Sequence, residues 1–129
     1  MGQRLRALSK YAWIDYPLRV KPLEVTPLEV KHQLAAGETL RLIDVREPAE
    51  FAIAKIEGAE LIPMGSVPAN LQTLDAAADD ATLIIFCHHG MRSLQVVNWL
   101  REHGVENCQS MAGGIELWST TVDSAVARY

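Results

Sequence analysis

The chain has 129 residues, of which 49% are hydrophobic, so it is long enough for one hydrophobic core and too short for two domains of ordinary size. Its formal charge of −4 and the absence of a Lys/Arg-rich run argue against nucleic acid as the main partner. Two cysteines do not make a disulfide scaffold, and no apolar run approaches the roughly 18 residues of a membrane span. We therefore expect a cytoplasmic protein with no membrane partner.

The N-terminal residues carry no clear pattern of their own. We assign residues 1–22 to an N-terminal extension and residues 23–129 to a single domain. The extension is either a small amphipathic segment that packs Tyr11 and Trp13 on the domain or an arm that binds a partner.

The first part of the domain predicts a helix, a strand and a second, shorter helix. Residues 26–29 place an N-cap threonine, a proline and a glutamate in the order that begins a helix, which should end near Ala36. The aliphatic residues 40–45 predict a strand, and residues 46–51 predict a turn that leads into a brief helix.

The rest of the domain continues this alternation. The expected elements are a strand at residues 58–63, a helix at 66–74, a strand at 83–86, a helix at 93–103, a strand at 108–110 and a short helix opened by Gly113 and Gly114. Strands separated by helices predict a mostly parallel sheet with helices on both faces. In such sheets ligands gather at the carboxyl ends of the strands, where Asp44 and Cys87 should both lie.

The segment from Cys87 to Ser93 carries the strongest functional signal. Cys87 leaves a buried strand and enters a short loop before a helix, where free backbone N–H groups and the helix dipole favour a thiolate. Arg92 adds a permanent positive charge, and Gly90 lets the chain curl tightly because it has no Cβ. We therefore interpret Cys87 as a nucleophile rather than a structural cysteine.

The second cysteine, Cys108, has no such surroundings. We interpret it as core packing, with a role as a resolving thiol as the alternative. Cys87, His88 and His89 lack the second paired cluster that structural zinc needs, so no metal site is expected.

Four blocks of sequence, in this order along the chain, match the motifs of one family. They are Asp44-Val45-Arg46-Glu47-Pro48-x-Glu50-Phe51, Ile56-x-Gly58-Ala59-x-x-Ile62-Pro63, Cys87-x-x-Gly90-x-Arg92-Ser93 and Gly113-Gly114-Ile115-x-x-Trp118. Together the blocks, which cover roughly residues 23–118, resemble the rhodanese-like (sulfurtransferase) domain family.

This resemblance implies a three-layer α/β domain with a five-stranded, mostly parallel central sheet. It also implies that Cys87 takes sulfane sulfur from a small anionic donor such as thiosulfate and holds it as a persulfide. The sulfur then passes to a thiophilic acceptor, either cyanide or a thiol, which a protein can supply. Arg92 would help to bind the donor and to fix the loop, and no cofactor is implied. The residues implied to form the substrate-binding loop are His88, His89, Gly90, Met91 and Ser93.

Two alternatives differ from this activity in their chemistry. Four residues separate Cys87 from Arg92, whereas phosphatases and arsenate reductases of the same fold resemble Cys-x5-Arg, with a wider loop for a tetrahedral oxyanion, so a phosphatase is the less favoured alternative. The other alternative is a persulfide carrier or binding module that relays sulfur between proteins without turnover.

Several residues near the predicted site have two interpretations. Asp44 and Arg46 either orient the active loop as a pair, or serve the structure, with Asp44 capping the next helix and Arg46 in an ion pair; we favour the structural role. His88 and His89 either modulate the charge around the sulfur or point into solvent. Met91 either lines the entrance to the site or fills space in the packing.

Overall fold

The computed structural model describes residues 21–129, so the predicted packing of Tyr11 and Trp13 lies outside the described residues. The strands are β1 Glu24–Val25, β2 Leu40–Asp44, β3 Glu60–Leu61, β4 Thr82–Phe86 and β5 Cys108–Met111. The helices are α3 Pro27–Ala35, α4 Pro48–Ile53, α5 Leu71–Ala77, α6 Met91–Glu102 and α7 Gly114–Thr121, and two 3₁₀ turns, η1 Met64–Ser66 and η2 Pro68–Asn70, precede α5. Along the described part of the chain, no helix has the length and apolar character needed to cross a bilayer.

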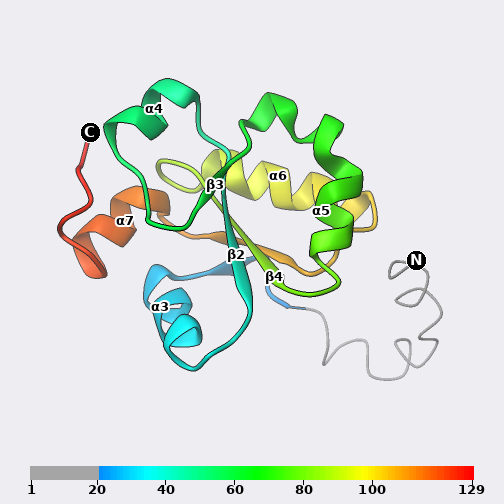
Figure 1. Cartoon of the computed structure of the whole chain (residues 1–129), viewed down its shortest axis with the longest axis horizontal. Helices are drawn as coiled ribbons and strands as arrows, with labels where there is room; N and C mark the ends of the chain where they lie inside the picture. Colours follow the sequence, from blue (N-terminus) through cyan, green and yellow to red (C-terminus); the bar gives the residue numbers. More distant parts are fainter. Residues whose placement is uncertain (1–20) are drawn as a thin grey trace.

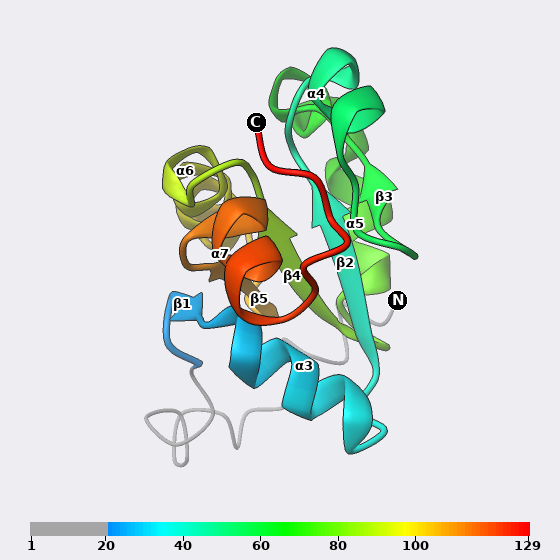
Figure 2. The ribbon, with the colours of Figure 1, turned by 90° about the vertical axis from the view of Figure 1, so that its left-hand side faces the viewer.

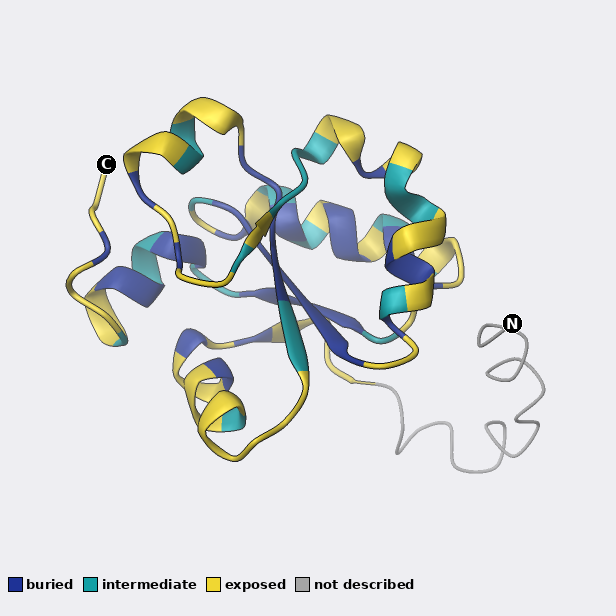
Figure 3. Ribbon diagram, viewed as in Figure 1, coloured by how far each residue is buried: buried dark blue, intermediate teal, exposed yellow. Residues whose placement is uncertain are grey.

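The five strands form one sheet in the order β1-β5-β4-β2-β3, and all of their pairings are parallel (Figure 1). The central strand β4 lies between β5 and β2 and is buried along its length (Figure 3). After Thr82 its sequence is apolar, because helices cover both of its faces. The predicted fold class, a three-layer α/β domain with a five-stranded sheet, is confirmed.

Side chains of β4 alternate between two apolar clusters, one on each face of the sheet. Leu83 and Ile85 pack with residues of α5 and α6, whereas Ile84 and Phe86 pack with residues of α3 and α7. In Figure 2, α3 and α7 lie in front of the sheet. Cys87 continues the alternation and belongs to the cluster of α5 and α6. The period of the strand therefore decides on which face the sulfur lies.

The first helix begins as the sequence predicts. Thr26 Oγ1 accepts a hydrogen bond from Glu29 N at 3.1 Å, and Glu29 Oε1 accepts one from Thr26 N at 2.8 Å. These reciprocal bonds satisfy two backbone donors at the helix start. Strand β1, directly before this helix, was not predicted.

Other elements differ from the predicted ranges. The helix expected at residues 66–74 is divided into η1, η2 and α5, because Pro68 has no N–H to continue a helical hydrogen-bond ladder. Helix α6 begins at Met91 rather than at residue 93, since Gly90 adopts a φ of 105° and forms the N-cap. The strand expected at residues 58–63 pairs with β2 only over Glu60–Leu61.

Candidate functional site

Cys87 lies directly after β4, and the loop that leads into α6 wraps around its sulfur. The backbone N–H of Gly90 donates to Cys87 Sγ at 3.1 Å, and that of Ser93 donates at 3.4 Å. Only 1% of Cys87 is exposed, and the residue also belongs to the apolar cluster of α5 and α6. Two backbone N–H groups of the loop therefore point at a buried sulfur, where they can stabilise a negative charge.

Helix α7 fixes the shape of the loop from behind. Its N-terminal amides donate to the carbonyl oxygens of Cys87 and His88 at 2.9 and 3.1 Å. A Cβ on Gly114, whose φ is 60°, would collide with both carbonyl oxygens, and a Cβ on Gly90 would lie 3.0 Å from Gly113 N. Helix α7 therefore fixes the orientation of the first two peptides of the loop, which leads on to the two amides, of Gly90 and Ser93, that donate to the sulfur. From the sequence we interpreted the glycine pair only as the start of a helix, and this contact was missed.

The hydroxyl of Ser93 lies between the sulfur and strand β5. Ser93 Oγ is 3.5 Å from Cys87 Sγ, 2.8 Å from Ser110 Oγ and 3.3 Å from the carbonyl oxygen of Gly90. Both serines are fully buried. Ser110 was not predicted as a site residue, because nothing in its local sequence distinguishes it from an ordinary strand serine.

Arg92 is bound by Glu50 of α4. Arg92 Nη1 lies 2.8 Å from Glu50 Oε1, and Arg92 Nη2 lies 3.0 Å from Glu50 Oε2. The hydrogen bonds from Arg92 lower the pKa of Glu50 to about 2, and the pKa of Arg92 is raised by the same pairing. A carboxylate thus compensates the positive charge that we expected beside the sulfur. Glu50 stands in the first family motif, but its contact with Arg92, 42 positions away, was not predicted.

Tyr129 connects the C-terminal segment to the loop, a contact that the sequence did not predict. Its ring stacks on His88 with 3.9 Å between ring centres and 8° between planes. Its hydroxyl donates to Glu50 Oε2 at 2.8 Å and accepts from Arg46 Nη1 at 2.9 Å. The segment reaches this place by running from α7 towards α4 (Figure 2). Arg46, Tyr129, Glu50 and Arg92 therefore form one hydrogen-bonded network.

Asp44 and Arg46 form a buried ion pair, with 2.6 Å between Asp44 Oδ2 and Arg46 Nη2. Asp44 is paired in register with Phe86, the residue before Cys87, so its side chain points to the opposite face of the sheet from the sulfur. The prediction that Asp44 caps the following helix is wrong, because Glu47 occupies the N-cap of α4. Arg46 does form the expected ion pair, and it is connected to the loop through Tyr129 and through the carbonyl oxygen of Glu50, to which its Nη1 donates at 3.2 Å.

The other loop residues differ in exposure. His88 is half-buried beneath Tyr129, and its pKa is lowered by burial and, to a smaller extent, by the charge of His89. His89 is exposed, with its ring centre 3.9 Å from that of His88. Met91 is 76% exposed in the first turn of α6, so it does not fill space in the core. Of the two histidines, only His89 lies in solvent as one interpretation predicted.

Cys108 is fully buried in β5, and its thiol lies 3.4 Å from the carbonyl oxygen of Val105. Burial raises the pKa of the Cys108 thiol to about 11, which leaves it protonated near neutral pH. This environment agrees with the interpretation of Cys108 as core packing. Within residues 21–129, no three His, Cys, Asp or Glu side chains are grouped so that they could hold a metal ion.

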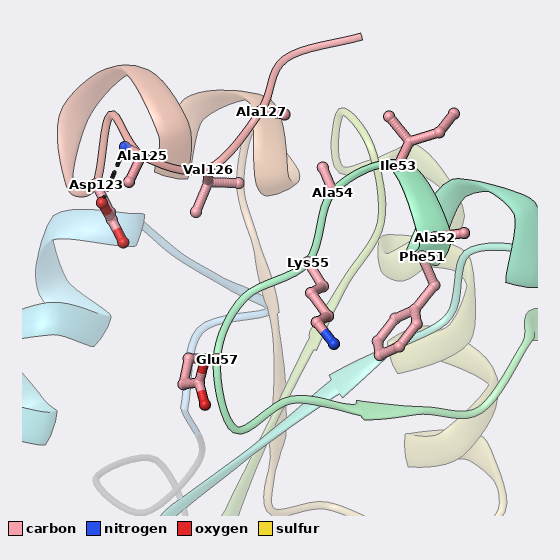
Figure 4. Close-up of a pocket in the computed structure, with 10 residues that line it drawn as sticks. All are labelled: Phe51, Ala52, Ile53, Ala54, Lys55, Glu57, Asp123, Ala125, Val126 and Ala127. Carbon is pink, nitrogen blue, oxygen red and sulfur yellow. Dashed lines mark hydrogen bonds between the residues drawn. The ribbon is translucent and has the colours of Figure 1, made fainter.

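A surface hollow lies between α4 and the C-terminal segment (Figure 4). Phe51 to Lys55 and Glu57 line one side, and Asp123 and residues 125–127 line the other. No residue of the loop from Cys87 to Ser93 lines this hollow, so it is separate from the sulfur site.

Comparison with known proteins identifies the family. A family model for the rhodanese-like domain matches residues 26–121. The protein named "Probable adenylyltransferase/sulfurtransferase MoeZ" of Mycobacterium tuberculosis is 31% identical over 115 residues, which cover 89% of this chain but only 29% of MoeZ. The "Thiosulfate sulfurtransferase GlpE" of Pseudomonas fluorescens is 37% identical over 87 residues, covering 67% of this chain and 77% of GlpE.

A solved structure agrees with this assignment. The rhodanese-like domain protein from Staphylococcus aureus superposes with a TM-score of 0.69 and 29% identity, over 84% of this chain and 99% of that one. The matches to the family, to named sulfurtransferases and to this structure agree with the motifs around Cys87. The chain therefore belongs to the rhodanese-like domain family.

Proposed function

We propose that Cys87 accepts sulfane sulfur from a small anionic donor such as thiosulfate, holds it as a persulfide and passes it to cyanide or a thiol. The observation that carries this proposal is the pair of backbone N–H groups, from Gly90 and Ser93, that point at Cys87 Sγ. Such groups stabilise a negative sulfur without giving it a proton, so the sulfur can act both as a nucleophile and as a leaving group. The name of the relative GlpE supports thiosulfate as the donor.

The proposed cycle consists of two displacements at sulfur. The Cys87 thiolate attacks the outer sulfur of thiosulfate, a new S–S bond forms, and the electron pair of the broken S–S bond leaves with sulfite. The acceptor then attacks the outer sulfur of the persulfide, and the electron pair of that bond returns to Cys87 Sγ. The amides of Gly90 and Ser93 stabilise the charge on Sγ at the start and the end of the cycle.

Arg92 has two tasks in this proposal. Its ion pair with Glu50 ties the start of α6 to α4 and so holds the loop in shape. About a third of its side chain, 36%, is exposed, which leaves part of the guanidinium free to meet an anionic donor. The loop residues His89 and Met91 are exposed and would meet the donor or the acceptor first. Asp44 and Arg46 would support the site through Tyr129.

The test is the transfer of sulfur to the protein itself. The chain is incubated with thiosulfate, and its intact mass is measured for the gain of one sulfur atom. Cys87→Ser should gain none, whereas the matched control Cys108→Ser should gain one as the native chain does. An unchanged gain in Cys87→Ser would place the reaction elsewhere and overturn the proposal.

A persulfide carrier is the second candidate, and two observations favour it. Cys87 is only 1% exposed, and MoeZ, a relative of this chain, is more than three times as long as the matched region. A carrier loaded with sulfur should transfer it quickly to a protein thiol and turn over thiosulfate and cyanide slowly. An enzyme should show steady turnover with both small molecules. Hydrolysis of a phosphate ester that depends on Cys87 would instead support the phosphatase alternative.

A further inference from the structure

Ser110 is a fully buried residue of β5 whose hydroxyl faces the sulfur site. It is paired in register with Ile85, so its side chain points to the same face of the sheet as Ile85 and, two residues further on, Cys87. Its Oγ lies 2.8 Å from Ser93 Oγ. The described residues offer the Ser110 hydroxyl no other hydrogen-bond partner.

The number of available partners fixes the direction of this hydrogen bond. A buried hydroxyl that donates to nothing is destabilising, because it has given up its bonds to water. Among residues 21–129, Ser110 has only Ser93 Oγ as an acceptor, so Ser110 donates and Ser93 accepts. Ser93 then keeps its own proton for the carbonyl oxygen of Gly90 at 3.3 Å or, when the sulfur is a thiolate, for Cys87 Sγ at 3.5 Å; a neutral Cys87 thiol instead donates to Ser93 Oγ.

We propose that Ser110 is a positioning residue for the nucleophile, because its hydrogen bond directs the hydroxyl proton of Ser93 to Cys87 Sγ whenever that sulfur is negative. When Sγ is uncharged, the same proton turns to the carbonyl of Gly90. The thiolate thus receives an O–H donor in addition to the two amides. No proton leaves the pair of serines in either state.

The effect of Ser110 on the sulfur runs through the donor strength of Ser93. A hydroxyl that accepts a hydrogen bond becomes a better donor, so Ser110 strengthens the bond from Ser93 to a negative sulfur. The second lone pair of Ser93 Oγ stays available to the S–H of the neutral thiol at 3.5 Å, whether or not Ser110 is present. Removal of the Ser110 hydroxyl therefore weakens the bond to the thiolate, which favours the protonated sulfur.

This inference extends the proposed function, because a cycle through a persulfide moves the negative charge off Sγ and back. In the persulfide the charge lies on the outer sulfur, so Ser93 bonds to Gly90. When the acceptor removes the outer sulfur, the charge returns to Sγ and the hydroxyl of Ser93 turns towards it. The preference for the thiolate itself does not depend on the identity of the sulfur donor.

The experiment measures the thiolate-to-thiol ratio of Cys87 from the ultraviolet absorbance of the thiolate across pH, with Cys87→Ser as the reference. Ser110→Ala should lower this ratio by about two- to fivefold at a given pH, the upper part of the range expected when one hydrogen bond to a charged group is weakened by about 10–30%. The matched control is Thr82→Val, which removes another buried hydroxyl of the same sheet at the other end of β4. It should leave the ratio unchanged.

A double-mutant cycle distinguishes the proposed positioning role of Ser110 from a purely structural one. Because Ser110 acts through Ser93, Ser110→Ala should change the ratio little in a Ser93→Ala background. If Ser110→Ala does not fold, Ser110→Thr and Ser110→Val replace it, since they match in shape and differ in the hydroxyl. An equal ratio in native chain and Ser110→Ala, or in the Thr and Val variants, would overturn the proposal.

The two proposals fail in different ways. If the native chain gains no sulfur from thiosulfate, the proposed function fails. The ultraviolet absorbance of the Cys87 thiolate still measures the effect of Ser110 in that case. If sulfur is gained but the ratio does not respond to Ser110, the inference about Ser110 fails and the proposed function stands.

Discussion

Glu50 and Arg92 form a two-point ion pair, with distances of 2.8 and 3.0 Å, between α4 and the first turn of α6. The carboxylate that holds Arg92 also accepts hydrogen bonds from the hydroxyl of Tyr129 and from the backbone N–H of Glu47. The arginine of the loop is thus a structural tie as well as a positive charge, and Glu50 sets how much of that charge an anion in the site experiences.

Removal of the negative charge at Glu50 should therefore make the site more attractive to anions. In Glu50→Gln, alkylation of Cys87 by iodoacetate should become roughly twofold or more faster relative to alkylation by neutral iodoacetamide, at low ionic strength. The matched control is Glu57→Gln, which removes an exposed carboxylate that lines the hollow beside α4. An equal change in both variants would show that the effect is one of net charge only.

The same pair should make stability depend on pH in the acid range. The pKa of Glu50 is lowered in the folded state to about 2 from an ordinary value of 4.5, so the pair stabilises the fold above the ordinary value and loses its effect as the pH falls to about 2. The difference in free energy of unfolding between the native chain and Glu50→Gln should shrink over this range. Urea unfolding at a series of pH values measures it, and a difference independent of pH would contradict the prediction.

The close approach of Gly114 to the loop should make an alanine there damaging. Gly114→Ala would place a Cβ against the carbonyl oxygens of Cys87 and His88 and would impose a φ of 60° on a residue that avoids it. We expect a loss of roughly 2 kcal/mol or more in free energy of unfolding, and slower alkylation of Cys87. Gly65→Ala is the control, because a Cβ there meets nothing within 4 Å. Similar losses in both variants would contradict the contact.

The buried ion pair predicts a large cost for the loss of one partner. Asp44→Asn leaves the guanidinium of Arg46 buried without a counter-charge, and should lower the free energy of unfolding by about 3 kcal/mol or more. Glu60→Gln, which breaks the exposed pair with Arg41, should cost less than about 1 kcal/mol. Urea unfolding of both variants at neutral pH gives the comparison, and equal costs would be inconsistent with the burial of Asp44.

The two cysteines should differ sharply in reactivity. At about pH 8 the folded chain should be alkylated at Cys87 and not at Cys108, whose pKa is raised by burial to about 11. In urea both should react, which peptide mass mapping can show. Rapid labelling of Cys108 in the folded chain would mean that β5 opens. Cys108 would then again be a candidate for a resolving thiol.

Features of the structure that depend on residues close together in the sequence could be predicted from it. The capping residues Thr26 and Glu29 lie three positions apart, and the nucleophile, the glycine and the arginine of the loop lie within six consecutive positions. Local hydrogen bonds and backbone conformations decide these features, and the residue types that favour them are few.

Features that depend on contacts between residues far apart in the sequence could not be predicted from it. Glu50 and Arg92 are 42 positions apart, Tyr129 and Glu50 are 79 apart, and Ser93 and Ser110 are 17 apart. Each of these residues is common on protein surfaces or in strands, so its type alone carries no signal. Strand β1 was missed for a related reason, since two residues at a sheet edge are too few to show a period.

The contact between α7 and the loop carbonyls limits how far the loop around Cys87 can be enlarged. An extra residue inserted between Cys87 and Arg92 would shift the loop peptides relative to the N-terminal amides of α7, which bind the carbonyls of Cys87 and His88. Conversion of this chain to the wider phosphatase-type ring would therefore require α7 to be repositioned along with the insertion. The diameter of the ring is a property of the helix behind it as much as of the loop's own length.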